Sequence, residues 1–241
     1  IFQGVNMKLY GAGSISDVRK CAALGVKGIL TNPQGFDQFF NGIKTLEEIT
    51  EELIEATKTE NLPVFIQIHG ADTETIIRRA RQIHSLSRRV GFKIISDTKG
   101  FKAIKILQTE EINCIATCLF TVAQAAIAAN IKAFGICPFI SRVRAAGLDP
   151  AHLVHTIKNG YKELENPPEI IAVSMKTVAD IELAIEAGAD AVGMRYPLLE
   201  AMMEHKSSRE AELLFAKNWI NVKGEDISYI GEGIKLKGEA E

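Results

Sequence analysis

The sequence lacks the features that mark membrane, nucleic-acid-binding and zinc-binding proteins. No apolar run approaches the roughly 20 residues that a membrane-spanning helix needs. The net charge is -2, and lysines and glutamates are interspersed, so no basic surface suits nucleic acid. No Cys-x-x-Cys pair occurs among the cysteines, which lie in or beside apolar segments: Cys21, Cys114, Cys118 and Cys137. We therefore expect buried free thiols in a cytoplasmic protein, with no zinc site and no membrane or nucleic-acid partner.

The composition that remains is that of one large globular domain. The chain has 241 residues, of which 46% are hydrophobic, and this suffices for a substantial core. Residues 1–6 resemble the remnant of a cleaved expression tag, so we take Met7 as the native start, with no signal peptide after it. The stretch from Lys223 is rich in glycine, lysine and glutamate, and we expect a flexible tail over residues 223–241. The predicted domain therefore spans residues 7–222.

Short apolar runs alternate with longer amphipathic stretches along the whole domain. Eight runs have the length and flanking turn residues of buried strands: residues 8–10, 26–30, 63–69, 90–95, 112–117, 133–137, 169–174 and 189–194. The stretches between them show helical spacing of apolar residues, with predicted N-caps at Ser14 or Ser16, Thr45, Asp72, Asp149 and Thr177. Two further helical stretches follow the eighth strand, at residues 197–204 and 208–219.

Eight strand–helix units in succession predict an α/β fold, a TIM (β/α)8 barrel with an additional C-terminal helix. An open doubly wound sheet needs fewer units and carries a glycine-rich phosphate-binding turn after its first strand. Residues 11–13 read Gly-Ala-Gly and lack the third glycine of that turn. In a closed barrel every strand is central, and functional side chains lie at the carboxyl ends of the strands.

Lys93 lies in the fourth apolar run and is the first candidate for a catalytic group. Strand alternation places Phe92 and Ile94 on the face that packs against helices and Lys93 on the face that points into the barrel. Desolvation lowers the pKa of a lysine and leaves a nucleophilic amine, whereas a lysine on an edge strand simply reaches water. Because a barrel has no edge strand, the sequence favours a functional lysine.

Polar side chains at the ends of neighbouring strands are predicted to surround Lys93. The same alternation points three of them inward: Gln67, His69 and Thr117. Thr31 and Asn32 follow the second strand and offer a hydroxyl and an amide suited to sugar hydroxyls. An inert buried network and an ordinary Asn-Pro turn are the alternative interpretations of these two groups.

Basic and hydroxyl side chains gather where the sixth, seventh and eighth strands end. They are Ser141, Arg142, Ser174, Lys176 and Arg195. Barrels often bind phosphate after strands seven and eight, and guanidinium, ammonium and hydroxyl groups all suit an anion. Each residue taken singly would be a solvated surface group. Together they favour a substrate with an anionic group.

Short motifs stand in order on successive strands: residues 31–33 (Thr-Asn-Pro), 93 (Lys), 116–120 (Ala-Thr-Cys-Leu-Phe), 123–125 (Ala-Gln-Ala), 138–142 (Pro-Phe-Ile-Ser-Arg) and 174–176 (Ser-Met-Lys). In this order and spacing they resemble the transaldolase family, specifically the short branch that includes fructose-6-phosphate aldolase. The resemblance covers residues 7 to 219. It implies an aldolase or transaldolase in which Lys93 forms a Schiff base with a ketose phosphate or dihydroxyacetone unit and the adjacent carbon–carbon bond breaks or forms. It also implies that neither a metal nor an organic cofactor takes part.

The resemblance further implies a role for several residues. Gln67 and Thr117 match the positions that hold the catalytic water, and Asn32 matches a residue that binds the dihydroxyacetone hydroxyls. The phosphate-binding positions of the family match Arg142, Ser174 and Lys176. Phe139 matches the phenylalanine of the transferases, whereas Gln67 matches the glutamine of the aldolases.

The first strand departs from the family pattern. The family carries an aspartate there that moves the proton of the reacting hydroxyl, and the corresponding residue is Ala12. His69 is a candidate to replace that carboxylate, since an imidazole suits acid–base work near neutral pH. Asp97 is a second candidate. The alternative for His69 is a hydrogen-bonding role at the rim.

Other functions and the assembly stay open in the sequence. A catalytically altered relative that binds a sugar phosphate or another anionic sugar would carry these residues, and so would a phosphosugar isomerase on the same fold. The last helix has an apolar stripe that either covers its own barrel or packs on a neighbour, made of Leu213, Leu214, Phe215 and Trp219. Because relatives form rings of subunits, we expect a homo-oligomer, a pentamer or decamer.

Overall fold

The structure, a computed structural model, describes residues 7–35 and 44–220. The chain divides into two compact units, one up to Met202 and one from Met203 on. The first unit holds the barrel, and the second holds the C-terminal helix. The predicted tag remnant (1–6) and the predicted tail (223–241) lie outside the described residues.

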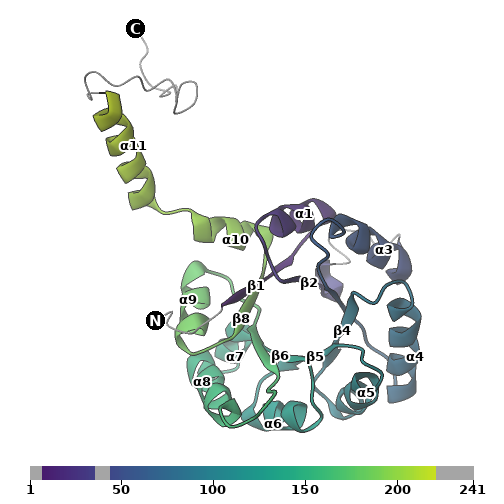
Figure 1. The fold of residues 1–241 in the computed structure, drawn as a ribbon. Coiled ribbons are helices and arrows are strands. Elements are labelled where there is room, and N and C mark those ends of the chain that lie inside the picture. The colour runs from purple at the N-terminus through teal and green to yellow at the C-terminus, as the bar shows by residue number, and fades with distance from the viewer. Residues whose placement is uncertain (1–6, 36–43, 221–241) are drawn as a thin grey trace. The chain divides into compact units, whose positions relative to one another are not determined.

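Eight parallel strands form a closed barrel in sequence order (Figure 1). They are β1 Lys8–Ala12, β2 Gly28–Leu30, β3 Val64–Gln67, β4 Val90–Ile95, β5 Cys114–Leu119, β6 Gly135–Pro138, β7 Glu169–Ala172 and β8 Ala191–Arg195. Because β1 pairs with both β2 and β8, the described sheet closes on itself. The predicted TIM (β/α)8 barrel is confirmed.

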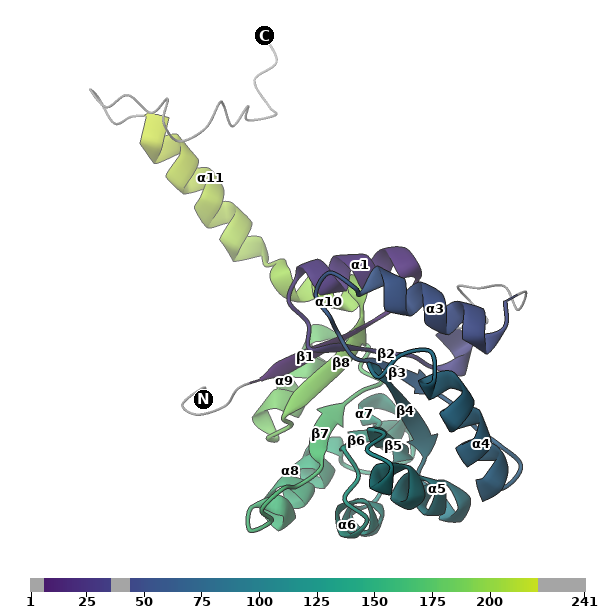
Figure 2. The same cartoon turned by 45° about the vertical axis from the view of Figure 1, so that its right-hand side comes forward.

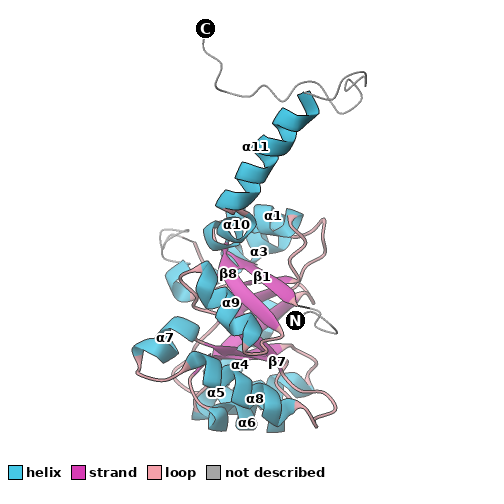
Figure 3. Cartoon of the chain, turned by 90° about the vertical axis from the view of Figure 1, so that its left-hand side faces the viewer, coloured by secondary structure: helices cyan, strands magenta, loops and turns pink. Residues whose placement is uncertain are grey.

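Helices surround the strands (Figures 2 and 3). They are α1 Ile15–Ala23, α3 Leu46–Ala56, α4 Thr73–His84, α5 Thr98–Thr109, α6 Val122–Asn130, α7 Ile140–Ala145, α8 Pro150–Tyr161, α9 Val178–Glu186 and α10 Tyr196–Met203. Most of them begin at a polar residue that follows a strand. This arrangement places the helix N-termini at the carboxyl end of the barrel.

The predicted helix starts are confirmed by their caps. The side chains of Ser14, Thr45 and Thr177 each accept a hydrogen bond from the backbone three residues on and form capping boxes. Asp72 and Asp149 cap α4 and α8 through their carboxylates. A cap satisfies backbone N–H groups that have no partner inside the helix, so these residues fix where each helix begins.

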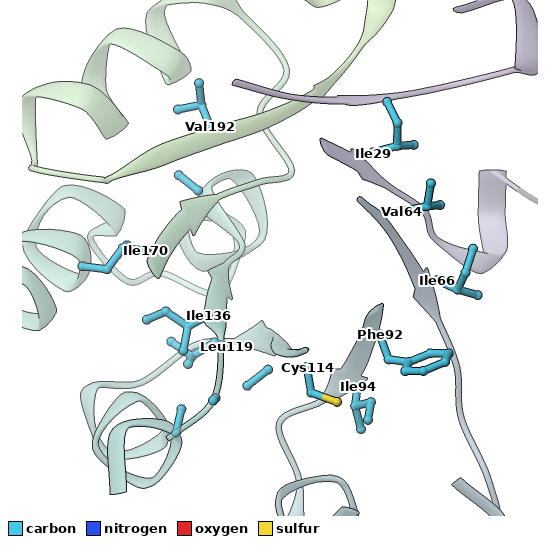
Figure 4. Close-up of a cluster of buried hydrophobic side chains, with 14 of the residues drawn as sticks. Ile29, Val64, Ile66, Phe92, Ile94, Cys114, Leu119, Ile136, Ile170 and Val192 are labelled. Atoms are coloured by element: carbon cyan, nitrogen blue, oxygen red, sulfur yellow. The ribbon is translucent and has the colours of Figure 1, made fainter. Parts of the chain in front are cut away.

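Two apolar layers fill the barrel unit. The outer layer lies between strands and helices, and Figure 4 shows part of it, including Phe92 and Ile94 of β4. The inner layer fills the barrel and includes Phe65, Ile115 and Ile171. Successive strand residues alternate between the two layers, as the pleat requires. The faces assigned to β4 from the sequence are therefore confirmed.

The carboxyl ends of the strands differ from the sequence prediction. β1 and β5 each continue two residues beyond the predicted ends, whereas β3 ends at Gln67, two residues earlier. The short helix α7 follows β6 directly and was not predicted. A helix of 6 residues is too short to establish an apolar period in the sequence.

The second unit contains α11 Lys206–Ile220, which confirms the predicted C-terminal helix. Its residues Leu213, Leu214 and Phe215 are exposed. The side chain of Trp219 lies outside the described part of the chain. The role of this helix in subunit contact stays a prediction. Within the described ranges, no helix combines the length and apolar character needed to cross a bilayer.

Candidate functional site

Lys93 lies inside the barrel, on the central part of β4. Its register partners are Gln67 on β3 and Ile115 on β5, and Ile115 belongs to the inner apolar layer. Phe92 and Ile94 point the other way, into the outer layer (Figure 4). The side chain of Lys93 is only 4% exposed. The strand pattern thus buries a primary amine among apolar side chains, as the sequence predicts.

The Lys93 amine contacts a backbone carbonyl, whereas the usual partner of a buried lysine is a carboxylate. Nζ donates a hydrogen bond to the backbone oxygen of Thr31 at 3.0 Å, and no ion pair to Lys93 occurs in residues 7–35 or 44–220. Burial lowers the pKa of Lys93, and the neighbouring thiols of Cys137 and Cys118 oppose this shift only in part. A buried ammonium group without a counter-ion is costly, so the site favours the neutral, nucleophilic amine.

Thr31 and Asn32 serve the local backbone in this structure. The Thr31 hydroxyl donates to the Phe65 carbonyl at 3.1 Å and accepts from the Gln67 N–H at 2.9 Å, which ties the end of β2 to β3. The exposed Asn32 accepts a hydrogen bond from the Gly35 N–H at 2.8 Å through Oδ1, as in an ordinary Asx turn. Their roles in binding substrate hydroxyls stay predictions.

Thr117 presents a hydroxyl that lacks a hydrogen-bond partner in the described structure. The residue is fully buried on β5, and Oγ1 makes no hydrogen bond of standard geometry, although it lies near enough to the Cys118 and Cys137 thiols to act on their pKa values. Its carbonyl, by contrast, accepts from both the backbone N–H and the hydroxyl of Ser96, at 2.9 and 2.8 Å. Buried polar groups are nearly always paired, so an unpaired hydroxyl inside a barrel points to a ligand or a water. The family resemblance implies that this position holds the catalytic water, and that role stays a prediction.

Two residues that sequence analysis missed hold the loops beside Thr117. Gln124 accepts hydrogen bonds from the Phe120 and Thr121 backbone N–H groups at 2.9 and 3.1 Å, and it donates to the Ser96 carbonyl at 2.9 Å. Ser96 is itself 5% exposed. The pair joins the loop after β4 to the loop after β5. The position of Gln124 in the Ala-Gln-Ala motif was the one signal that pointed to it.

The predicted acid–base residues lie at the rim. His69 is exposed and follows the end of β3, and its carbonyl accepts a hydrogen bond from Arg79 at 2.6 Å. Asp97 is the N-cap of α5 and accepts from the Gly100 N–H at 2.7 Å. The carboxylate of Asp97 is therefore engaged in helix capping. The proposed proton transfer by His69 stays a prediction.

The start of α7 and the loop after β7 meet through two serines. Ser141 Oγ donates to the carbonyl of Ser174, and the Ser141 N–H donates to the same oxygen at 3.3 Å. Ser174 has a left-handed backbone with φ of 64°, which is uncommon for a residue with a side chain. Strained backbone of this kind is concentrated at functional sites. The structure therefore brings together two of the regions predicted to bind phosphate.

Two predicted phosphate ligands have exposed side chains near this junction. Arg142 lies on α7 with its guanidinium carbon 5.0 Å from the centre of the Phe139 ring, a cation–π contact. The Lys176 N–H donates to Asp180 Oδ2 at 2.9 Å, which fixes the loop after β7. Burial acts to raise the pKa of Asp180, but hydrogen bonds from Lys176 and Arg144 outweigh it and lower the pKa. The contact of Arg142 and Lys176 with an anion stays a prediction.

Within the described residues, no cluster of three or more His, Cys, Asp or Glu side chains is arranged to hold a metal ion. The groups that the barrel interior does bring together are an amine, an unpaired hydroxyl and two thiols. Such a set suits nucleophilic addition to a carbonyl carbon.

Comparisons with known proteins identify a family with a similar sequence. A sequence model of the family described as transaldolase/fructose-6-phosphate aldolase matches residues 12–229. A probable transaldolase of Thermoplasma volcanium is 28% identical over 218 residues, covering 90% of this chain and 96% of the relative. A probable transaldolase of Streptococcus equi subsp. zooepidemicus is 29% identical over 211 residues, with 87% and 96% coverage.

Solved structures support the fold alone. The thiamine phosphate pyrophosphorylase of Pyrococcus furiosus superposes with a TM-score of 0.54 and 14% identity, covering 78% of this chain and 85% of that one. A mutant flavocytochrome b2 superposes with a TM-score of 0.55 and 15% identity, covering 79% and 57%. The family match extends over most of the chain, including the strands that carry Lys93 and Thr117. The chain belongs to the transaldolase/fructose-6-phosphate aldolase family.

Proposed function

We propose that the protein is a Schiff-base aldolase or transaldolase that transfers or releases a dihydroxyacetone unit of a ketose phosphate through Lys93. The observation that carries the proposal is the buried amine, which has a lowered pKa and a carbonyl in place of a counter-ion. Membership of the family supports the same reaction class.

The chemistry follows from the state of the amine. Neutral Lys93 attacks the ketone carbon of the substrate to give a carbinolamine, which takes up one proton and loses water to give a protonated imine. When the adjacent carbon–carbon bond breaks, its electron pair moves toward the imine nitrogen, which acts as the electron sink. The aldehyde product leaves, and the remaining enamine either takes a proton or attacks a second aldehyde. In both cases water then adds to the imine carbon, the C–N bond breaks, and the ketone product is released from Lys93. Release corresponds to aldolase activity, and attack on the second aldehyde corresponds to transaldolase activity.

Other groups of the interior support the proton transfers. A water bound to the unpaired hydroxyl of Thr117 and to Gln67 would carry protons to and from the carbinolamine and the enamine. The reacting hydroxyl of the substrate also loses a proton when the bond breaks. Since Ala12 lacks a carboxylate, we assign that proton to the exposed imidazole of His69. His69→Ala with undiminished lyase turnover would contradict this assignment.

The anionic end of the substrate is assigned to the loops after β6 and β7. Arg142, Ser174 and Lys176 offer a guanidinium, a hydroxyl and an ammonium group, and the contact of Ser141 with the Ser174 carbonyl brings these loops together. Arg142 and Lys176 are exposed, so their charged groups are solvated in the free protein and folding incurs no desolvation cost for them. Both side chains can reach a phosphate in solution. Asn32 and Thr31 are assigned to the dihydroxyacetone end.

Trapping with borohydride tests the proposal directly. The protein is incubated with dihydroxyacetone or fructose 6-phosphate, reduced with sodium borohydride and digested, and the adduct is located by mass spectrometry. We expect a reduced adduct on Lys93. Lys93→Met is the negative control, and Lys105→Met, a change on an exposed residue of α5, is the matched control that keeps the adduct. No adduct on Lys93, or an adduct unaffected by Lys93→Met, would overturn the proposal.

The second candidate is a catalytically altered relative that binds a sugar phosphate, and Ala12 in place of the family's aspartate favours it. Turnover separates the two candidates. Trapping followed by release of glyceraldehyde 3-phosphate from fructose 6-phosphate supports the enzyme. Trapping or binding without release of an aldehyde supports the second candidate.

We also propose that the protein acts in the cytoplasm as a homo-oligomer, a pentamer or decamer. The exposed apolar residues of α11, Leu213, Leu214 and Phe215, support subunit contact. The four cysteines, all free, support a reducing compartment. Light scattering of the full chain measures the assembly, and a monomer would contradict it.

A further inference from the structure

Two cysteines oppose each other inside the barrel, at an irregularity between β5 and β6. The ladder pairs Ala116 with Ile136 and then Leu119 with Pro138, so two residues of β5 face the single residue Cys137 on β6. One of the two is Cys118, which has a left-handed backbone with φ of 56°. The bulge therefore sets Cys118 beside Cys137 on the neighbouring strand.

Both thiols point to the same side of the sheet. Cys137 is fully buried in the inner apolar layer, and Cys118 packs against that layer from a partly exposed position. Ile136, by contrast, belongs to the outer layer (Figure 4). Neighbouring strands lie about 4.8 Å apart, and a disulfide joins Cα atoms separated by about 4.4 to 6.8 Å. Adjacent strands with thiols on one face thus bring their Cα atoms into the range that a disulfide spans.

The same thiols are neighbours of the Lys93 amine. Cys137 and Cys118 both act on the pKa of Lys93, and Lys93 acts on the pKa of each thiol. Cys118 directly follows Thr117, whose hydroxyl also acts on the pKa of both thiols. A bond between the thiols would therefore form at the wall of the space next to the amine.

We propose that Cys118 and Cys137 are a redox-sensitive dithiol that a peroxide converts into a disulfide within the barrel, and that this bond blocks carbonyl substrates from Lys93. The blocking effect rests on the proposed function.

The partly exposed Cys118 thiol reacts first: its sulfur takes an oxygen atom from the peroxide, the O–O bond breaks, and the peroxide leaves as water or an alcohol. The Cys137 sulfur then attacks the sulfenic sulfur, the S–O bond breaks, and water leaves with the remaining thiol proton. The two thiols lose two electrons in total, and the peroxide gains them.

Burial sets the rate of this reaction. It raises the pKa of Cys118, and it raises the pKa of Cys137 to about 11. Lys93 lowers both pKa values in part, and Arg142 does so for Cys118, whereas Glu169 raises that of Cys137 further. Because the thiolate is the reactive form, the dithiol persists in a reducing compartment and closes only under sustained oxidant.

The covalent bond is tested independently of activity. The reduced full chain is treated with hydrogen peroxide and then denatured in guanidinium chloride so that the buried thiols become accessible. Remaining thiols are alkylated with N-ethylmaleimide, and the protein is analysed intact and after trypsin digestion. We expect two of the four thiols to escape alkylation until a reductant is added. We also expect a disulfide between the peptides of residues 106–132 and 133–142. Four alkylated thiols, or sulfinic acid without a linked peptide, would overturn the proposal.

Matched variants identify the sulfur atoms. Cys118→Ala removes the linked peptides, whereas Cys114→Ala keeps them, although Cys114 lies on the same strand and in the same peptide. Cys114 belongs to the outer layer (Figure 4), so it has no access to Cys137. A link that persists in Cys118→Ala but disappears in Cys114→Ala would contradict the assignment.

The effect on the amine is measured by borohydride trapping with dihydroxyacetone. Oxidised wild type should trap at least tenfold less than the reduced protein, a reductant should restore trapping, and Cys118→Ala should trap equally with and without peroxide. A linked but fully trapping protein would refute the blocking effect. Failure of the reduced wild type to trap would instead refute the proposed function, while the peptide analysis still decides whether the disulfide forms.

Discussion

Lys8 and Lys93 lie toward opposite ends of the barrel, and the surroundings of the two lysines differ. At the amino end, Lys8 Nζ lies 2.7 Å from Glu169 Oε1, and the hydroxyl of Tyr10 donates to Glu169 Oε2 at 2.7 Å. The Lys8 side chain is 41% exposed, so its ammonium group also keeps contact with water. Toward the carboxyl end, Lys93 is 4% exposed and donates to a backbone carbonyl.

The difference separates stability from chemistry. Around Glu169 the charges compensate one another, since the carboxylate lies beside the Lys8 ammonium group and accepts a hydrogen bond from Tyr10 through Oε2. Oε1, which faces Lys8, has the ion pair but no hydrogen bond of standard geometry. Around Lys93 the amine lacks a counter-ion, and the Thr117 hydroxyl has only the neighbouring thiols and no hydrogen bond of standard geometry. A buried interior disfavours both conditions. Folding tolerates this arrangement because the rest of the barrel is well packed. The unsatisfied groups are those that a carbonyl substrate and a water would satisfy.

Lys93→Met should have the largest effect on activity and the opposite effect on stability. Loss of the amine removes the imine, so we expect turnover to fall at least a thousandfold, on the order of 4 kcal/mol in the barrier. Removing a buried ionisable group should raise the free energy of unfolding by about 1 kcal/mol, or about 2–4 °C in the melting temperature. Steady-state kinetics and thermal unfolding measure the two effects.

The pH dependence sharpens this prediction. The folded-state pKa of Lys93 is lowered, so between that pKa and the unfolded value near ~10.4 the unfolded state binds more protons. Wild-type stability should therefore rise with pH across this window relative to Lys93→Met. The advantage of the variant should be largest at low pH and shrink toward pH 10. A difference in stability that is independent of pH would show that Lys93 is charged in the folded protein.

Thr117→Val should lower activity less than Lys93→Met does and should change stability only slightly. Valine keeps the shape of threonine and removes a hydroxyl that has no partner, so the free energy of unfolding should change by less than about 1 kcal/mol. We expect kcat to fall about a hundredfold, because the bound water loses its anchor. Thr117→Ser keeps the hydroxyl and serves as the control. Wild-type kcat in Thr117→Val would mean that the hydroxyl takes no part in the reaction.

Glu169→Gln, at the amino end of the barrel, should have the opposite effect: it should lower stability and leave the reaction at Lys93 nearly unchanged. The amide keeps the size of the carboxylate but loses its charge beside Lys8 and Tyr10, so we expect a loss of about 1–2 kcal/mol in unfolding free energy. Imine trapping at Lys93 should stay within about twofold of wild type, a difference below ~0.5 kcal/mol. Lys8→Met should cost less, since Lys8 is half exposed. Equal losses of trapping and stability would remove the distinction between the two ends.

The barrel could be predicted because its signals are local. Alternation over a few residues assigns Phe92, Lys93 and Ile94 to their faces, and caps such as Thr45 mark helix starts. The closed sheet then places Lys93 in the interior without any knowledge of its contacts. Both inferences depend on periods of two and about 3.6 residues, which tertiary contacts rarely override in long alternating segments.

The details of the site could not be predicted, because they depend on partners distant in sequence. The carbonyl that receives the Lys93 amine is 62 positions away and has no side-chain signature. The bulge that sets Cys118 beside Cys137 depends on how β5 pairs with β6. Ser96 and Gln124 meet across 28 positions. Residue types suggested which side chains take part in the site. Only the register of the closed barrel shows which of these side chains have a hydrogen-bond or ion-pair partner.

Arg142→Ala should have the smallest effect, and one confined to the anionic part of the substrate. Arg142 is exposed and contacts Phe139 through a cation–π interaction, so we expect no measurable change in melting temperature. KM for fructose 6-phosphate should rise about tenfold, or about 1.4 kcal/mol, while trapping of dihydroxyacetone, which has no phosphate, stays unchanged. Arg19→Ala, a change on an exposed residue of α1, is the matched control. If Arg142→Ala instead impaired the reactions of fructose 6-phosphate and dihydroxyacetone equally, Arg142 would act on the reaction at Lys93 itself. Anion binding at the end of the barrel would then not be separate from the chemistry inside it.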